Sequence, residues 1–103
     1  MLHITSLNEG LELFKALGSD VRIEILNILL ENDNMSMNEL ASRLNITNGA
    51  LTSHIKKLEN CGLITTSSES AVHGNQKICS IHLDKILIDL KSLPKSRMFI
   101  IQN

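Results

Sequence analysis

Apolar residues recur at the spacing of a helix along the first sixty residues of the chain. Residues 8–17 repeat an apolar residue at every third position, which predicts an amphipathic first helix that ends at Gly18. Residues 21–30 are apolar over most of the helix circumference, and Ser19 or Asp20 is placed to cap them. We therefore expect the second helix to be the central and most buried one.

A capping box opens the third predicted helix. In Ser36-Met-Asn-Glu39 the hydroxyl and the carboxylate can each bond a free amide at a helix start, and the helix continues to Leu44. After a tight break, Thr47 caps a longer helix that covers residues 47–60. A short helix, a tight turn and a longer helix form a helix-turn-helix.

The longer helix is predicted to have an unusual outer face. At 100° per residue its inner side collects four apolar residues, Ala50, Leu51, Ile55 and Leu58. The opposite arc collects small polar or cationic residues, namely Asn48, Gly49, Thr52, Ser53, Lys56 and Lys57. An ordinary solvated face would contain more Glu–Lys pairs. Short hydrogen-bonding groups followed by lysines suit close approach to base edges and phosphates.

The apolar period changes after the longer helix. Residues 63–67 and 76–83 are predicted strands around a polar, turn-rich tip, and together they form a β-hairpin, or wing. Asp84 is expected to cap a last helix over residues 85–93, which Pro94 stops. The expected fold is mainly α with a small β-hairpin, in the order α-α-α-α-β-β-α of a winged helix-turn-helix.

Composition and charge narrow the class of protein. The chain has 103 residues, enough for one domain with a modest core, and no apolar run approaches the roughly 18 residues of a membrane span. Its start lacks the features of a signal peptide, and its two cysteines are typical of a reducing compartment, so we expect a cytoplasmic protein without membrane contact. The net charge is −1, but acidic residues concentrate in residues 1–42 and basic residues are in excess afterwards.

Two segments resemble the ArsR-like transcriptional regulators. LFKALGSDVRIEIL is similar to their leucine, acidic-residue, arginine, isoleucine-leucine signature, through Leu17, Asp20, Arg22, Ile25 and Leu26. LTSHIKKLENCGLI is similar to their recognition-helix pattern, through Thr52, His54, Ile55, Leu58, Gly62 and Leu63. The resemblance covers about residues 11–90. It implies that the helix over residues 47–60 enters the major groove of DNA, N-terminal residues first.

The resemblance and the helix face together give a set of candidate DNA-binding residues. They are Thr47, Asn48, Gly49, Thr52, Ser53, Lys56, Lys57 and, on the wing, Lys77. The wing over residues 68–77 is expected on the adjacent backbone or in the minor groove. The family's metal sensors use a Cys-any-Cys motif or Asp and His pairs on the last helix. This chain has neither, so we expect no metal and no cofactor.

A homodimer through the first and last helices is also expected. One small core cannot bury all the apolar residues of those helices, namely Leu11, Phe14, Leu87, Leu90 and Leu93. Resembling regulators pair through the same two helices. Two copies would then present their recognition helices to half-sites one helical turn of DNA apart.

Each candidate also has a structural interpretation. Asn48 and the wing residues His73 and Asn75 can simply face water, and Gly49 can merely weaken its helix by about 1 kcal/mol. Thr47 and Ser36 are expected to be helix caps first and phosphate contacts second.

Four further residues are expected to have structural roles. Arg22 is expected to pack its stem at the start of the second helix with its head free, the alternative being a pairing with a carboxylate or with DNA phosphate. His54 is expected to be a partly buried histidine, and Cys61 a small buried filler that forms no redox or metal pair with Cys79.

The leading hypothesis is a sequence-specific, repressor-like transcriptional regulator in residues 1–93. The alternative is a winged helix used for protein contact, with the acidic first third as the partner surface. An enzyme is not expected, because neither a nucleophile–base motif nor paired carboxylates occur in the sequence. Residues 94–103 are expected to be a tail, or the start of a linker to a further region.

Overall fold

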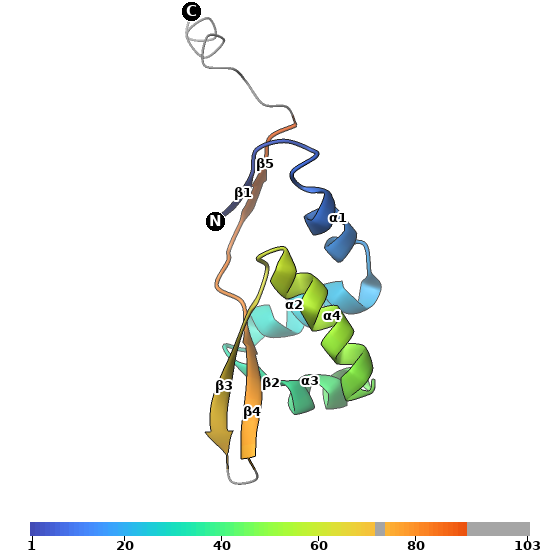
Figure 1. Ribbon diagram of the computed structural model, residues 1–103, viewed down its shortest axis with the longest axis vertical. Coiled ribbons are helices and arrows are strands. Elements are labelled where there is room, and N and C mark those ends of the chain that lie inside the picture. Colours follow the sequence, from blue (N-terminus) through green and yellow to red (C-terminus); the bar gives the residue numbers. More distant parts are fainter. Residues whose placement is uncertain (72–73, 91–103) are drawn as a thin grey trace, which may run out of the picture.

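The computed structural model describes residues 1–71 and 74–90. Its helices are α1 (Leu11–Leu17), α2 (Asp20–Glu31), α3 (Met37–Leu44) and α4 (Asn48–Asn60). Its strands are β1 (Leu2–Ile4), β2 (Met35–Ser36), β3 (Thr65–Ala71), β4 (Gly74–Ser80) and β5 (Ile86–Ile88). Figure 1 shows the β3–β4 hairpin projecting from one end of the helical body, with β1 and β5 at the opposite end. The winged helix-turn-helix prediction is confirmed.

The predicted caps set the helix starts. Ser19 Oγ accepts from the Arg22 amide at 3.3 Å at the start of α2. Ser36 and Glu39 form both bonds of the capping box before α3, and Thr47 Oγ1 accepts from the Ala50 amide at 3.1 Å before α4. The turn between α3 and α4 closes at Asn45, whose left-handed φ of 54° lets its amide bond carbonyls at the end of α3.

The core lies where α2, α3 and α4 meet. Its fully or almost fully buried side chains are aliphatic and include Leu13, Ile25, Leu29, Leu40, Leu51, Ile55 and Leu58. α2 is central as predicted, but the phase predicted for α1 is wrong. Leu13 and Ala16 are buried, Phe14 and Leu17 pack at the margin of the core, and Leu11 is 51% exposed. The rotation of this short helix is therefore set by the neighbours it packs against and not by its own apolar period.

The wing is one side of a three-stranded antiparallel sheet. Strand order is β2-β4-β3, with Met35 opposite Cys79 and Thr66 also opposite Cys79. The prediction missed β2. It also placed the hairpin strands at residues 63–67 and 76–83, so both lay further from the wing tip than β3 and β4 do. Ile78, Cys79 and Ser80 are all buried, so both faces of β4 are covered at the end of the strand that lies against the helices.

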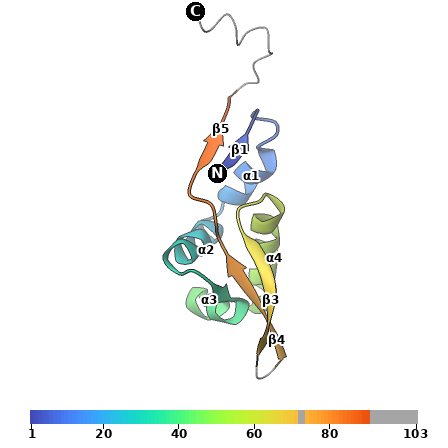
Figure 2. The same cartoon turned by 90° about the vertical axis from the view of Figure 1, so that its left-hand side faces the viewer.

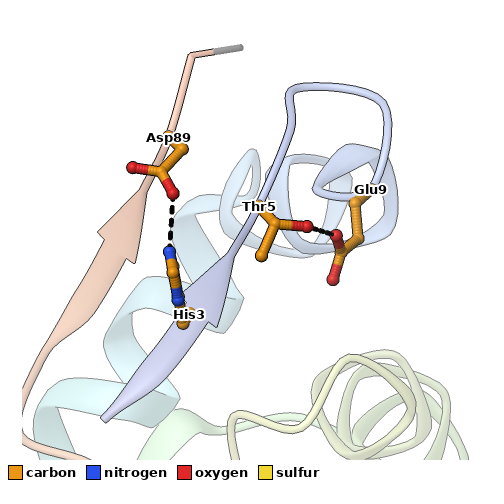
Figure 3. A network of polar contacts seen from close by, with 4 residues as sticks. All are labelled: His3, Thr5, Glu9 and Asp89. Atoms are coloured by element: carbon orange, nitrogen blue, oxygen red, sulfur yellow. Dashed lines mark hydrogen bonds and ion pairs between the residues drawn. The ribbon is translucent and has the colours of Figure 1, made fainter. Parts of the chain in front are cut away.

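The predicted last helix is wrong over the described residues. Residues 86–88 form β5, which pairs in parallel with β1 so that Leu2 lies opposite Ile86 and Ile4 opposite Ile88. In Figure 3, His3 and Asp89 join across the two strands, with His3 Nε2 at 2.7 Å from Asp89 Oδ2. β-Branched residues favour a strand once a neighbouring strand is available, and the first residues of the chain supply it.

The segment that follows β1 is held by its own side chains. Thr5 Oγ1 donates to a carboxylate oxygen of Glu9, a contact also drawn in Figure 3. At the start of α1, a Cβ on Gly10 would lie 2.7 Å from a ring carbon of Phe14 and 2.8 Å from a methyl of Ile4. Glycine therefore lets β1 and α1 approach each other closely.

Some predictions fall outside the described residues. They concern His73 at the wing tip, the part of the predicted last helix beyond residue 90, and the tail over residues 94–103. Within the described residues, no helix combines the length and the apolar character that a membrane crossing requires.

Candidate nucleic-acid interface

The inner side of α4 is fixed by three large aliphatic side chains. Leu51, Ile55 and Leu58 are at most 1% exposed and pack against the rest of the core. Ala50 was predicted on the same side but is exposed, because it lies at the edge of the inner arc where no neighbour covers it. The small, methyl-only side chain of Ala50 therefore belongs to the outer surface.

The outer arc of α4 is open to solvent. Of the seven predicted DNA-binding residues at α4, Thr52 is half-buried and six are exposed, namely Thr47, Asn48, Gly49, Ser53, Lys56 and Lys57. Lys77 is exposed on β4, opposite Ser68 of β3. In the view of Figure 2, α4 and the hairpin lie towards the same side, whereas Figure 1 shows them apart, with α3 between their lower ends.

The structure brings the start of α3 next to the wing. A shallow hollow there is lined by Ser36, Met37, Asn38, Asn75, Gln76 and Lys77. Asn38 was not among the predicted residues, although it lies in the first turn of α3. It also bonds α4, because the Asn48 amide nitrogen donates to Asn38 Oδ1 at 3.3 Å. The sequence could have indicated Asn38 as a candidate, because it is a polar residue two positions after the capping Ser36.

Two side chains at the start of α4 have their hydrogen bonds partly used. Thr52 Oγ1 donates to the Asn48 carbonyl at 2.8 Å, so its hydroxyl proton is occupied while the oxygen can still accept. Asn48 keeps its amide oxygen and one N–H available beside the bond to Asn38. Both residues can therefore offer hydrogen bonds outward without losing those they make within the protein.

Gly49 has no packing reason to be glycine. A Cβ at this position would meet nothing within 4 Å. An alanine would fit and would favour the helix. Gly49 therefore lowers the stability of α4, and no contact within the protein requires it. A missing side chain on an exposed first turn leaves the backbone open to close approach by another molecule.

The cations of the interface form no ion pair with a carboxylate in the part of the chain that the structure describes. Within the described residues the ion pairs join His3 to Asp89 and Lys15 to Glu12, so Lys56 and Lys77 take part in none. Lys57 differs in position. It lines a hollow with residues of α1 and α2, namely Glu12, Lys15, Ala16 and Arg22, together with Asn60. Lys56 and Lys77 are thus the better-placed cations for a ligand on the outer arc.

Arg22 has a structural role, as predicted, but its head, which was expected to be free, connects three helices. It is 8% exposed, and its guanidinium donates to the Ala16 carbonyl at 2.7 Å and to the Lys15 carbonyl at 3.0 Å. These carbonyls end α1, where a cation is favoured by the free acceptors and the helix dipole. A third bond of 3.1 Å joins Arg22 to Nδ1 of His54, which confirms that His54 faces inward from α4.

His54 must be neutral to accept that bond. An arginine can only donate, so Nδ1 accepts and the ring proton lies on Nε2. Burial lowers the pKa of His54, and the charges of Arg22 and Lys57 lower it further. Protonation would remove the acceptor and place two cations in contact.

We therefore expect the protein to lose stability as the pH falls below 6.5, the ordinary pKa of histidine. The unfolded chain binds a proton at His54 in this range while the folded chain does not, so unfolding is favoured. Above pH 6.5 the contribution of this group is constant. Urea midpoints at pH 7.5 and 5.5 should move further apart in the native chain than in His54→Gln, whose side-chain oxygen can still accept from Arg22. Equal shifts in both proteins would contradict the role of His54.

The two cysteines are free and lie in different surroundings. Cys61 is half-buried and its thiol donates to the Leu58 carbonyl at 3.4 Å. Cys79 is buried beside the sulfur of Met37, and burial raises the pKa of its thiol to about 11. Within the described residues no three His, Cys, Asp or Glu side chains gather in a group that could hold a metal ion.

Sequence comparison supports the winged helix-turn-helix fold and DNA binding. The family described as winged helix-turn-helix DNA-binding matches residues 19–65, which span α2, α3 and α4. An uncharacterised protein of Methanocaldococcus jannaschii is 40% identical over 63 residues, or 61% of this chain and 67% of that protein. The transcriptional activator HlyU of Vibrio cholerae is 40% identical over 58 residues, or 56% of this chain and 53% of HlyU. The aligned region thus spans about half of HlyU.

Solved structures extend the likeness beyond the aligned residues. The structure of HlyU from Vibrio cholerae matches with a TM-score of 0.60 at 27% identity, covering 90% of this chain and 85% of that one. A protein described as an ArsR family transcriptional regulator matches with a TM-score of 0.59, covering 88% and 81%. Its identity is 22%, so this second likeness shows the fold alone.

Proposed function

The chain belongs to the winged helix-turn-helix DNA-binding family, and on that premise we propose that it regulates transcription by binding a specific duplex sequence. The observation that carries the proposal is the outer arc of α4, which is exposed, small and polar at its N-terminal end and cationic further along. A helix of this size fits the major groove, and short side chains allow the helix to lie close to base edges.

The residues of the interface have different proposed roles. Asn48, Thr52 and Ser53 contact base edges, since amide and hydroxyl groups can donate to or accept from them. Gly49 lets the DNA backbone approach α4, in keeping with the open space around its Cα. Thr47 caps α4 and offers the helix N-terminus to a phosphate.

The lysines of the interface contact phosphates. Lys56 lies behind the base-contacting residues, and Lys77 lies on the wing beside the hollow at the start of α3. Lys57 reaches the DNA backbone from the side of α1. The wing rests on the adjacent backbone or in the minor groove. A few cations on a chain of net charge −1 predict moderate affinity that falls steeply with salt.

The proposal includes a homodimer, because a symmetric pair of proteins recognises two half-sites and gains affinity from both. The predicted pairing through the last helix is no longer possible over residues 86–88, which form β5. Exposed apolar side chains remain on α1 and β5, including Leu11 and Leu87. The repressor-like action stays a prediction. HlyU is named a transcriptional activator, so the sign of regulation has to be measured.

The proposal also covers the domain bounds, the compartment and the absence of enzymatic activity. We place the DNA-binding domain in residues 1–93 and its action in the cytoplasm, where the free thiols of Cys61 and Cys79 would stay reduced. We assign it no enzymatic activity, because the family and the named relatives are DNA-binding proteins and regulators.

Selection of bound sequences from random duplex DNA tests the function and finds the target in one experiment. We expect a short enriched motif, repeated as a palindrome if the protein binds as a dimer. Fluorescence anisotropy on that motif should show binding that weakens as salt rises. Absence of any enriched sequence, together with no DNA binding at low salt, would instead support a protein-interaction module.

A further inference from the structure

The outer edge of β5 is a surface that DNA binding does not explain. In the described residues, β1 and β5 form a sheet of two strands, and such a sheet has little stability by itself. Ile86, Leu87 and Ile88 are 37%, 45% and 37% exposed. An apolar strand with an open edge is a template for pairing with another strand.

The hydrogen bonds to β1 show which backbone groups of β5 are left for a partner. The Leu2 amide donates to the Lys85 carbonyl at 3.1 Å, and the Asp89 amide donates to the Ile4 carbonyl at 2.8 Å. In a parallel ladder alternate residues face the same neighbour, so Lys85, Leu87 and Asp89 face β1. The N–H and C=O groups of Ile86 and Ile88 therefore point to the outer edge.

We propose that β5 of a second copy of this chain occupies this edge in antiparallel orientation, about a twofold axis at Leu87. In this register Ile86 lies opposite Ile88 of the second copy, and both residues direct their backbone groups at each other. The two equivalent pairs form a closely bonded antiparallel ladder. The outer edge of β1 offers less, because within that strand only His3 faces away from β5.

Charge complementarity selects the register. Centring the pair on Leu87 places Lys85 of each copy opposite Asp89 of the other. Asp89 Oδ2 bonds His3 Nε2 of its own copy, and the second carboxylate oxygen can accept from the lysine, which stabilises a cross-strand pair. Centring it on Ile86 places Lys85 opposite a leucine, and centring it on Ile88 does the same to Asp89. The segment Lys85-Ile-Leu-Ile-Asp89 is thus complementary to itself in one antiparallel register.

This interface deepens the homodimer of the proposed function by naming its contact. It replaces the helix pairing expected from the sequence with a strand pairing that joins the two sheets into one of four strands. Its tests measure self-association in the absence of DNA, so a failure here and a failure to bind DNA can be told apart.

A disulfide at the twofold axis tests the contact directly. Leu87 faces Leu87 of the second copy as a non-hydrogen-bonded pair, whose Cα atoms lie about 4.5 Å apart, within the range a disulfide can bridge. Under mild oxidation Leu87→Cys should run as a dimer of twice 11.4 kDa on a non-reducing gel. Leu30→Cys, exposed on α2, is the control and should stay monomeric. No cross-link in Leu87→Cys, or equal cross-linking in both variants, would overturn the proposal.

Reversal of the charges tests the register in solution. Lys85→Asp places two carboxylates opposite each other, so the dimer should dissociate at least ten-fold more readily in analytical ultracentrifugation. Lys85→Asp with Asp89→Lys restores opposite charges across the axis and should recover part of the association, since it also removes the contact of Asp89 with His3. Unchanged association of the single variant, or no recovery in the double variant while circular dichroism shows both to be folded, would count against this register.

Discussion

Replacing Arg22 with methionine is expected to lower the free energy of unfolding by about 3 kcal/mol. Methionine fills much of the buried space but donates no hydrogen bond. The carbonyls of Lys15 and Ala16 and the Nδ1 atom of His54 then lose their partner at the junction of α1, α2 and α4. For a domain of this size such a loss lowers the melting temperature by on the order of 15 °C. Urea and thermal unfolding followed by circular dichroism measure both quantities.

Arg43→Met is the matched control for this substitution. Arg43 is exposed in the last turn of α3, so its loss should change the free energy of unfolding by less than about 0.5 kcal/mol. Arg22→Lys keeps the charge but cannot reach three acceptors with one ammonium group, and we expect it to lie between Arg22→Met and the native chain. Equal losses in Arg22→Met and Arg43→Met would mean that the bonds of Arg22 contribute little.

The sequence predicted the helix-turn-helix well because its signals are local. A cap depends on residues within one turn, and the capping box at Ser36 and the cap at Thr47 place the starts of α3 and α4 where the structure has them. The buried face of α4 followed from periodicity in the same way, since Leu51, Ile55 and Leu58 share one side of the helix. These features needed no knowledge of the rest of the chain.

The features that the sequence did not predict depend on distant partners. Leu2 pairs with Ile86 across almost the whole chain, and Met35 pairs with Cys79. A run such as Ile-Leu-Ile fits a short helix or a strand equally well until its neighbour is known. The bond between Arg22 and His54 has the same character, because both residues were assigned structural roles separately and only the fold brings them into contact.

The candidate site could be predicted as a face but not as a set of contacts. The wheel indicated which residues of α4 point outward, and the structure exposes them apart from the half-buried Thr52. The periodicity of the sequence could not show that Lys57 lies towards α1 or that Asn38 bonds Asn48, because both depend on how neighbouring helices pack. The division of roles among these residues is therefore a question for variants.

Changing Thr52 and Lys56 together to alanine is expected to weaken binding to the selected DNA sequence by about thirty-fold, or about 2 kcal/mol. Thr52 supplies a proposed base contact and Lys56 a proposed phosphate contact, and both are lost. The fold should tolerate the change, because alanine is a better helix former than threonine and Lys56 is exposed and makes no ion pair in the described part of the chain. Anisotropy titrations across a range of salt concentrations measure the effect.

The two single variants separate base contact from phosphate contact. Lys56→Ala should reduce the slope of log affinity against log salt by about 0.9 for each bound protomer on any DNA, because each protomer releases one fewer counterion. Thr52→Ala should leave that slope unchanged and weaken binding to the selected sequence more than to random DNA. Lys15→Ala, which removes an exposed lysine of α1 paired with Glu12, is the control and should change neither quantity. If the double variant of Thr52 and Lys56 binds DNA with the affinity and the salt slope of the native chain, the outer arc of α4 is not the DNA-contacting surface, even though the chain has a winged helix-turn-helix fold.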